Sequence, residues 1–204
     1  MADLPFALPA DLAATLSHAL DVEGKIPAAL EALGPVAGRD LGFGDTERGP
    51  VLDTTRRIGG RIRGLPLDPA TWSRRRAGSF DVLVGLWSAF RGVDPREIAA
   101  ADRLLRPGGR LLVLHDYGRD DVSRLRGPLP EHDSWSRRSG PFLRGGFRVR
   151  VLHCWWTFES LESARDFLVA SFGETGEAVG AGMKRPRLSY NVAVYHRTRL
   201  LSSD

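Results

Sequence analysis

The side chains best suited to acid–base chemistry are three consecutive residues, His115, Asp116 and Tyr117, which follow the apolar run Leu111–Leu114. Such a run is typical of a parallel strand covered on both faces, and open α/β sheets bind ligands just beyond the carboxyl ends of their strands. A histidine there could accept a proton from a nucleophilic substrate atom, with Asp116 or another carboxylate orienting its ring. The alternative is that the histidine only packs or forms a local hydrogen bond. We take His115 and Asp116 as the candidate catalytic residues.

A second candidate site lies in Arg39–Asp45, RDLGFGD, where the backbone itself could hold a ligand. Gly42 and Gly44 have no side chain, so a ligand could approach the main chain closely. The helix expected over Thr46–Ile58 would then present unpaired amides to the ligand's polar groups. The alternative is a glycine-rich turn inherited from a binding ancestor and no longer used.

The stretch Ser79–Tyr117 predicts the element that positions these groups, a complete strand–helix–strand unit. Val82–Leu86 and Leu111–Leu114 are continuous apolar runs, as expected for buried strands. Between them, Asp94 is placed to cap a helix, and Glu97 could return a hydrogen bond to complete a capping box. A Pro-Gly-Gly sequence then ends the helix. Because such crossovers are right-handed, the two strands are expected to be parallel.

The same residues carry a resemblance to a known family. FDV at 80–82, followed by LLRPGGRLLVL at 104–114, resembles the fourth and fifth strands and the linking helix of class I S-adenosylmethionine-dependent methyltransferases. RDLGFGD resembles the family's first-strand signature, in which an acidic residue and a G-x-G turn meet the methionine end of the cofactor. The resemblance implies a doubly wound, mostly parallel α/β sheet with an antiparallel C-terminal strand. It also implies an N-terminal helical segment over residues 1–35 and a methyltransferase-like domain over residues 36–204.

The resemblance further implies S-adenosylmethionine as the cofactor, bound at the ends of the first, second and fourth strands. The residues that match these positions are Asp40, Gly42, Gly44, Asp45, Gly64, Leu65, Gly85, Leu86 and Trp87. No metal-ligand spacing occurs among the histidines, so no metal is expected.

One strand–helix unit of the family is missing, because too few residues lie between Leu65 and Phe80 to form it. Either this stretch connects the second strand directly to the fourth, or RIRGLPLD at 61–68 is the third strand and the second has been lost. The family usually ends its second strand with an acid that binds the ribose hydroxyls, but this chain has Pro66 there, and Asp68 is the possible substitute. The aspartate that typically contacts adenine has no clear counterpart. We therefore expect weakened cofactor binding.

The remaining periodic segments predict further elements. Leucines at every fourth position indicate a first helix capped near Asp11, and the C-terminal third alternates strand and helix patterns. The expected elements are a helix at Leu12–Leu20, a helix at Ile26–Leu33, a strand at Phe147–Phe158, a helix at Leu161–Phe172 that ends at Gly173, and a strand at Tyr190–His196.

Composition limits the possible settings of the protein. The chain has 204 residues, enough for one well-filled core, and its single cysteine, Cys154, excludes an internal disulfide. Neither a signal peptide nor a membrane-spanning run is recognisable, so we expect a soluble cytoplasmic protein with no membrane partner. Lys25 and Lys184 are the only lysines beside many arginines, and acidic residues are interspersed with them. This pattern fits the coding bias of a GC-rich genome and argues against nucleic acid as a partner.

Two functional classes remain. The first is an enzyme that transfers a methyl group from S-adenosylmethionine to a small molecule or a protein side chain by in-line displacement. The second is a non-catalytic relative that keeps the fold as a binding or interaction protein. The G-x-G turn and the His115-Asp116 pair favour the enzyme, whereas Pro66 and the missing unit favour the second class. We take the enzyme as the first hypothesis. The sequence indicates neither the methyl acceptor nor the oligomeric state.

Overall fold

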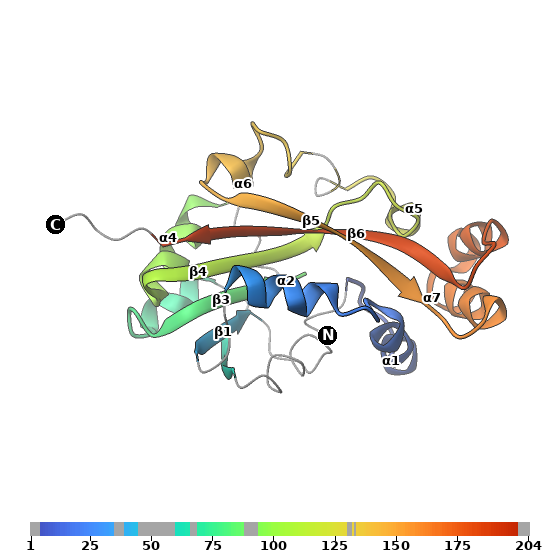
Figure 1. Ribbon diagram of the computed structural model, residues 1–204, viewed down its shortest axis with the longest axis horizontal. Coiled ribbons are helices and arrows are strands. Elements are labelled where there is room, and N and C mark those ends of the chain that lie inside the picture. The colour runs from blue at the N-terminus through green and yellow to red at the C-terminus, as the bar shows by residue number, and fades with distance from the viewer. Residues whose placement is uncertain are drawn as a thin grey trace.

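The computed structural model of this chain describes residues 5–34, 39–44, 60–65, 69–87, 94–129, 132 and 134–199. Within these residues one six-stranded sheet has the order β2-β1-β3-β4-β6-β5 (Figure 1). The strands are β1 (Asp40–Gly44), β2 (Arg61–Leu65), β3 (Phe80–Leu86), β4 (Leu105–Asp116), β5 (Arg148–Thr157) and β6 (Arg187–Thr198). The first four are parallel, and β6 runs antiparallel to both β4 and β5. The predicted fold class is thus confirmed.

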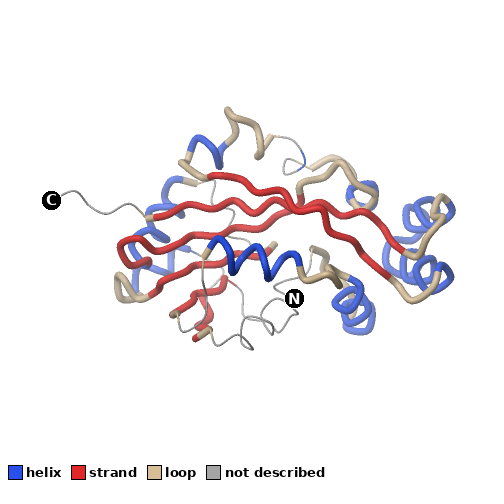
Figure 2. Tube along the Cα trace, viewed as in Figure 1, coloured by secondary structure: helices blue, strands red, loops and turns tan. Residues whose placement is uncertain are grey.

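Helices pack on both faces of this sheet, as Figure 2 shows. One face is covered by α1 (Ala10–Ala19), α2 (Lys25–Leu33) and α7 (Leu161–Ala181), and the other by η1 (Pro69–Arg74), α4 (Pro95–Leu104) and α6 (Pro141–Arg144). The short helix α5 (Ser123–Arg126) follows β4. No helix in the described part of the chain has the length and apolar character needed to cross a membrane.

The predicted strand–helix–strand unit of Ser79–Tyr117 forms, and it differs from the prediction where its helix meets the second strand. The predicted capping box with Glu97 stays a prediction. The Asp94 carboxylate caps α4 by accepting a hydrogen bond from the backbone amide of Arg96 at 2.8 Å. The prediction that Pro107–Gly109 would separate helix and strand is wrong, because β4 begins directly after the helix and includes these residues. The additional residues are accommodated by a register shift opposite Phe80 and Val82 of β3.

The position of β2 decides between the two alternatives for the missing unit. Arg61–Leu65 pairs in parallel with β1, which in turn pairs with β3. In doubly wound sheets with the strand order 3-2-1-4-5-6, the second strand lies beside the first and the third lies outside it. Arg61–Leu65 is therefore the second strand, and the chain then passes through η1 to the counterpart of the fourth. No strand lies beyond β2 among the described residues.

The flanking helices α1, α2 and α7 form where they were predicted, but their ends differ from the predicted ones. Pro9, not Asp11, occupies the N-cap position of α1, so the prediction of an Asp11 cap is wrong. The predicted end of a helix at Gly173 is confirmed, since that residue has a left-handed φ of 56°, and a second helical segment continues to Ala181. The helix expected over Thr46–Ile58 lies outside the described residues.

Candidate functional site

Four parallel strands end at one edge of the sheet, where two glycines lie side by side. Gly44 of β1 pairs with Leu65 of β2 and with Gly85 of β3, and Gly85 pairs with Val113 of β4. These four paired residues form one row across the sheet. Leu65 and Val113 pack into the layer that contains α4, so the row lies on that face of the sheet. The centre of this row, Gly44 and Gly85, has no side chains, and Gly85 is buried.

The glycine pair lies where the strand order reverses. From β1 the chain leads to β2 on one side and then returns to β3 on the other side. Open α/β sheets bind ligands outside the carboxyl ends of the strands at this switch point. The structure therefore places Gly44, Gly64, Leu65, Gly85 and Leu86 at the edge where the sequence predicted the cofactor. Asp45 lies outside the described residues.

Gly42 lies in the packed interior of the sheet. A Cβ added to Gly42 would lie 2.5 Å from Leu83 Cδ2 and 2.9 Å from Leu65 Cδ1, both of which belong to the packed layer beneath α4. The absence of a side chain at Gly42 thus lets core leucines fill the space. A valine at this position would disturb the core packing and could not serve as a selective test of ligand binding.

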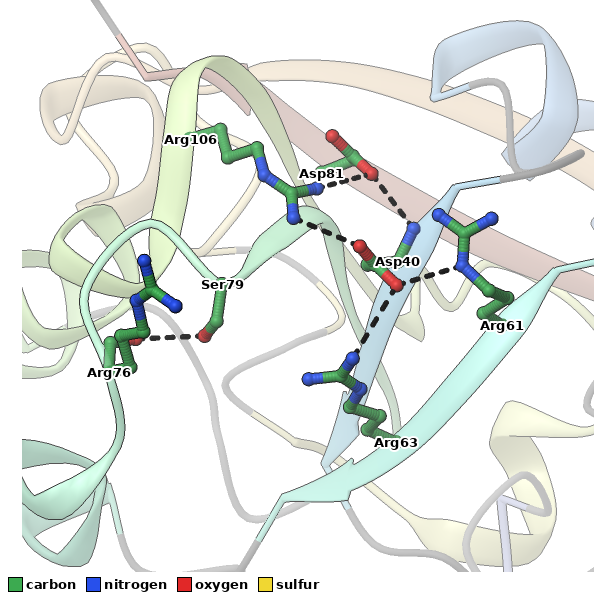
Figure 3. A network of polar contacts seen from close by, with 7 residues as sticks. All are labelled: Asp40, Arg61, Arg63, Arg76, Ser79, Asp81 and Arg106. Atoms are coloured by element: carbon green, nitrogen blue, oxygen red, sulfur yellow. Dashed lines mark hydrogen bonds and ion pairs between the residues drawn. The ribbon is translucent and has the colours of Figure 1, made fainter.

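Asp40 lies at the opposite edge from the glycine pair, because it is the first residue of β1. Its carboxylate accepts hydrogen bonds from Arg61 at 3.0 Å and from Arg106 at 2.9 Å (Figure 3). Arg106 also pairs with Asp81 at 2.7 Å, and Asp81 accepts a hydrogen bond from the Asp40 amide at 2.8 Å. The placement of Asp40 makes it part of a structural ion-pair network at the amino edge and does not support the predicted cofactor contact.

This network gives a pH-dependent prediction. Hydrogen bonds from Arg61 and then Arg106 lower the pKa of Asp40 to about 2. Because this pKa is below that of an unfolded aspartate, ionised Asp40 stabilises the folded state. This stabilisation is complete above about pH 4 and is lost as the pH falls through about 2. In urea titrations, the stability difference between wild type and Asp40→Asn should shrink over that range. A constant difference would contradict the assignment, and Asp166→Asn, an exposed change on α7, is the matched control.

Asp116 is the centre of a buried polar cluster, with 3% of its surface exposed. It accepts hydrogen bonds from Trp87 Nε1 at 3.0 Å and from the Tyr190 hydroxyl at 2.5 Å, and its other oxygen contacts Arg126 at 2.5 Å. Burial, reinforced by the negative Asp116, raises the pKa of Tyr190 well above its usual value, so that tyrosine stays protonated. Asp116 therefore joins β3, β4, α5 and β6 at the carboxyl edge.

His115 and Asp116 lie on opposite faces of β4, because successive residues of a strand point in opposite directions. The His115 ring contacts Trp135 edge to face, with ring centroids 5.1 Å apart, and lies near Phe142 in the layer beneath α6. Asp116 points into the layer that contains Tyr190 and α1. The prediction that Asp116 orients the His115 ring is therefore wrong. His115 does share the face of Gly44 and Gly85, and its role as a base stays a prediction.

Trp87 connects the glycine edge to the Asp116 cluster. It follows β3 with a left-handed φ of 45°, a conformation uncommon for residues other than glycine and often found at functional sites. Its backbone amide donates to the Leu114 carbonyl at 2.9 Å, and its ring stacks on Tyr190. Sequence reasoning identified Trp87 and Asp116 but missed Tyr190 and Arg126, since no local pattern connects residues so far apart.

No group of three or more His, Cys, Asp or Glu side chains within the described ranges is arranged to hold a metal ion. The chemistry that the carboxyl edge can offer is close backbone contact at Gly44 and Gly85, aromatic surface at Trp87, and the imidazole of His115. These groups suit an organic ligand laid across the ends of β1 and β3.

The six-stranded sheet, its strand order and its antiparallel C-terminal strand define the Rossmann-like fold of class I methyltransferases. A Bacillus halodurans protein, provisionally assigned as a methyltransferase, aligns with 87% of this chain and 100% of its own, at a TM-score of 0.50 and 11% identity. A provisionally assigned type II methyltransferase from Anaeromyxobacter dehalogenans aligns with 85% of this chain and 96% of its own, at a TM-score of 0.49 and 15% identity. The sequence matches no protein-family model and no curated protein. At these identities the likeness shows the fold alone.

Proposed function

We propose that this protein is an S-adenosylmethionine-dependent methyltransferase that acts on a small molecule or a protein side chain. The observation that carries the proposal is the pairing of Gly44 with Gly85 at the switch point of the sheet. A row without side chains at that position lets a ligand contact the backbone of both strands. When bound there, the cofactor would supply an electrophilic methyl group on its sulfonium.

The chain's own residues would bind and orient the reactants. Gly44 and Gly85 would meet the cofactor through their backbone, with Leu86 and Trp87 forming the adjoining wall. In-line methyl transfer needs mainly the correct alignment of the two reactants. Where the acceptor must lose a proton, His115, on the same face as the glycines, is the group proposed to accept it.

The second candidate function is a non-catalytic protein that keeps the methyltransferase fold for binding a partner. The observation that favours it is the engagement of Asp40, the acid of the first-strand signature, by Arg61 and Arg106 at the amino edge. If neither S-adenosylmethionine nor S-adenosylhomocysteine gives a binding isotherm in titration calorimetry, this second function is the better account of the chain.

Substitution of Gly85 tests the proposed cofactor site. Gly85→Val is expected to weaken S-adenosylmethionine binding by at least about tenfold, because its side chain would fill the gap where the ligand meets the backbone. Because Gly85 is buried, the valine tests binding only in a variant that is shown to be folded. Titration calorimetry measures the affinity, and circular dichroism and thermal unfolding report on the fold.

The matched control is Gly182→Val, where an added Cβ has only an ordinary contact, 3.6 Å from the Val179 carbonyl. It should bind the cofactor as tightly as the wild type. If a folded Gly85→Val variant also binds with wild-type affinity, the cofactor does not lie on this row, and the proposed site is refuted.

A further inference from the structure

A cavity of about 620 Å³ lies beyond the carboxyl edge, at the end of the antiparallel β5–β6 pair that adjoins α5 and the last turns of α7. It exists because β6 begins at Arg187, whereas the pairing of β6 with β4 starts only at Val192. Its walls come from α5, β5, β6 and α7, and none of the glycines at the switch point lines it. Its volume falls within the range of small-molecule sites, roughly 300–1,000 Å³.

The charged groups around this cavity are mostly cationic. Arg124, Lys184, Arg185 and Arg187 line it, with Asp121 as the one carboxylate among its lining residues. That carboxylate already accepts hydrogen bonds from the Ser189 amide at 3.0 Å and the Ser189 hydroxyl at 2.7 Å. Its other oxygen lies 3.8 Å from Arg124 Nη1, so this carboxylate offsets one of the four cations. The remaining positive charge favours a negatively charged occupant.

Apolar side chains also line the cavity, and one of them is aromatic. Trp155, Val179, Met183 and Leu188 contribute this surface. The Arg187 guanidinium lies 4.3 Å from the centroid of the Trp155 ring, a cation–π contact. An arginine that stacks on an aromatic ring can still form paired hydrogen bonds to an anion through its N–H groups.

We propose that this cavity binds a small organic anion, in which a carboxylate, sulfonate or phosphate group is attached to an apolar or aromatic body. The cationic rim would hold the anionic group, and the surface of Trp155, Val179 and Met183 would pack against the body. The inference goes beyond the proposed function and does not depend on it, because the glycine row and the cavity share no residue.

Two fluorescent probes that share an aromatic skeleton and differ in charge test this proposal. The anion 8-anilinonaphthalene-1-sulfonate should bind the folded protein saturably, with one site per chain. The neutral N-phenyl-1-naphthylamine should bind more weakly. Added salt should weaken the binding of the anion and leave that of the neutral probe unchanged. Energy transfer from tryptophan to the bound anion should fall in Trp155→Phe, which keeps the apolar wall.

Paired substitutions identify the site. Arg185→Gln combined with Arg187→Gln should weaken binding of the anion by about tenfold or more, because two charge-assisted contacts are lost. The control is Arg96→Gln combined with Arg138→Gln, which removes the same charge from exposed positions outside the cavity. Ala178→Trp should fill the cavity and prevent binding of both probes. Thermal unfolding confirms that each variant is folded.

The proposal is overturned if the anion does not bind, if the two probes bind equally well, or if both arginine pairs have the same effect. Failure of S-adenosylmethionine to bind would leave these results unchanged, because they use neither the cofactor nor the glycine edge.

Discussion

Replacing Asp116 with alanine is expected to lower the free energy of unfolding by about 3–5 kcal/mol, the usual effect of breaking a buried ion pair. The change would leave the Tyr190 hydroxyl, the Trp87 indole N–H and the Arg126 guanidinium without the acceptor that they share. For a chain of this size, each kcal/mol corresponds to roughly 2–4 °C in Tm. Urea unfolding followed by circular dichroism measures the loss directly.

Two further variants separate the charge of Asp116 from its packing. Asp116→Asn keeps the volume and one acceptor oxygen, so it should be destabilised less than Asp116→Ala. A double-mutant cycle with Tyr190→Phe should show a coupling energy, since the two side chains are in contact. Asp166→Ala, on the exposed side of α7, is the control. If Asp116→Ala were no less stable than this control, the cluster would contribute nothing measurable to the fold.

Most of the sheet could be predicted from the sequence because its signals are local. Val82–Leu86 and Leu111–Leu114 are too apolar to be anywhere but in the interior, and both prove to be central strands. Asp94 indicates the start of α4 through its own hydrogen bond to the backbone. The start of β4 was mispredicted because Pro-Gly-Gly usually marks a turn. Here these residues lie in the register shift between Leu105 and Arg110, which both pair with β3, and their backbone bonds to Arg199.

The candidate site was harder to predict because it depends on where strands begin and end. The RDLGFGD segment does not reveal that β1 starts at Asp40, which places this acid at the opposite edge from Gly44 and Gly85. Similarly, extension of β4 to Asp116 separates His115 and Asp116 by the alternation of the strand. The partners of Asp116 lie on other elements, and only the tertiary structure brings them together.

The last prediction concerns the affinity for S-adenosylmethionine and follows from the confirmed position of β2. Pro66 lies outside the described residues, but it directly follows Leu65, the last residue of β2, which pairs with Gly44. The family usually has an acid after this strand to accept the ribose hydroxyls, and proline cannot do so. Pro66→Asp is expected to tighten cofactor binding by about one to two orders of magnitude, because charge-assisted hydrogen bonds contribute roughly 1.5–3 kcal/mol and each tenfold requires about 1.4 kcal/mol.

Substitutions at the same position separate the carboxylate from the removal of proline. Pro66→Ala releases the backbone without adding an acceptor, so its affinity should stay close to that of the wild type. Pro66→Asn adds a neutral acceptor and should fall between alanine and aspartate. Titration calorimetry of the four proteins gives this order directly, and thermal unfolding shows whether each is folded. Equal affinities for Pro66→Asp and Pro66→Ala would mean that residue 66 does not reach the ribose, and the argument from the missing acid would then fail even though β2 holds the second position in the sheet.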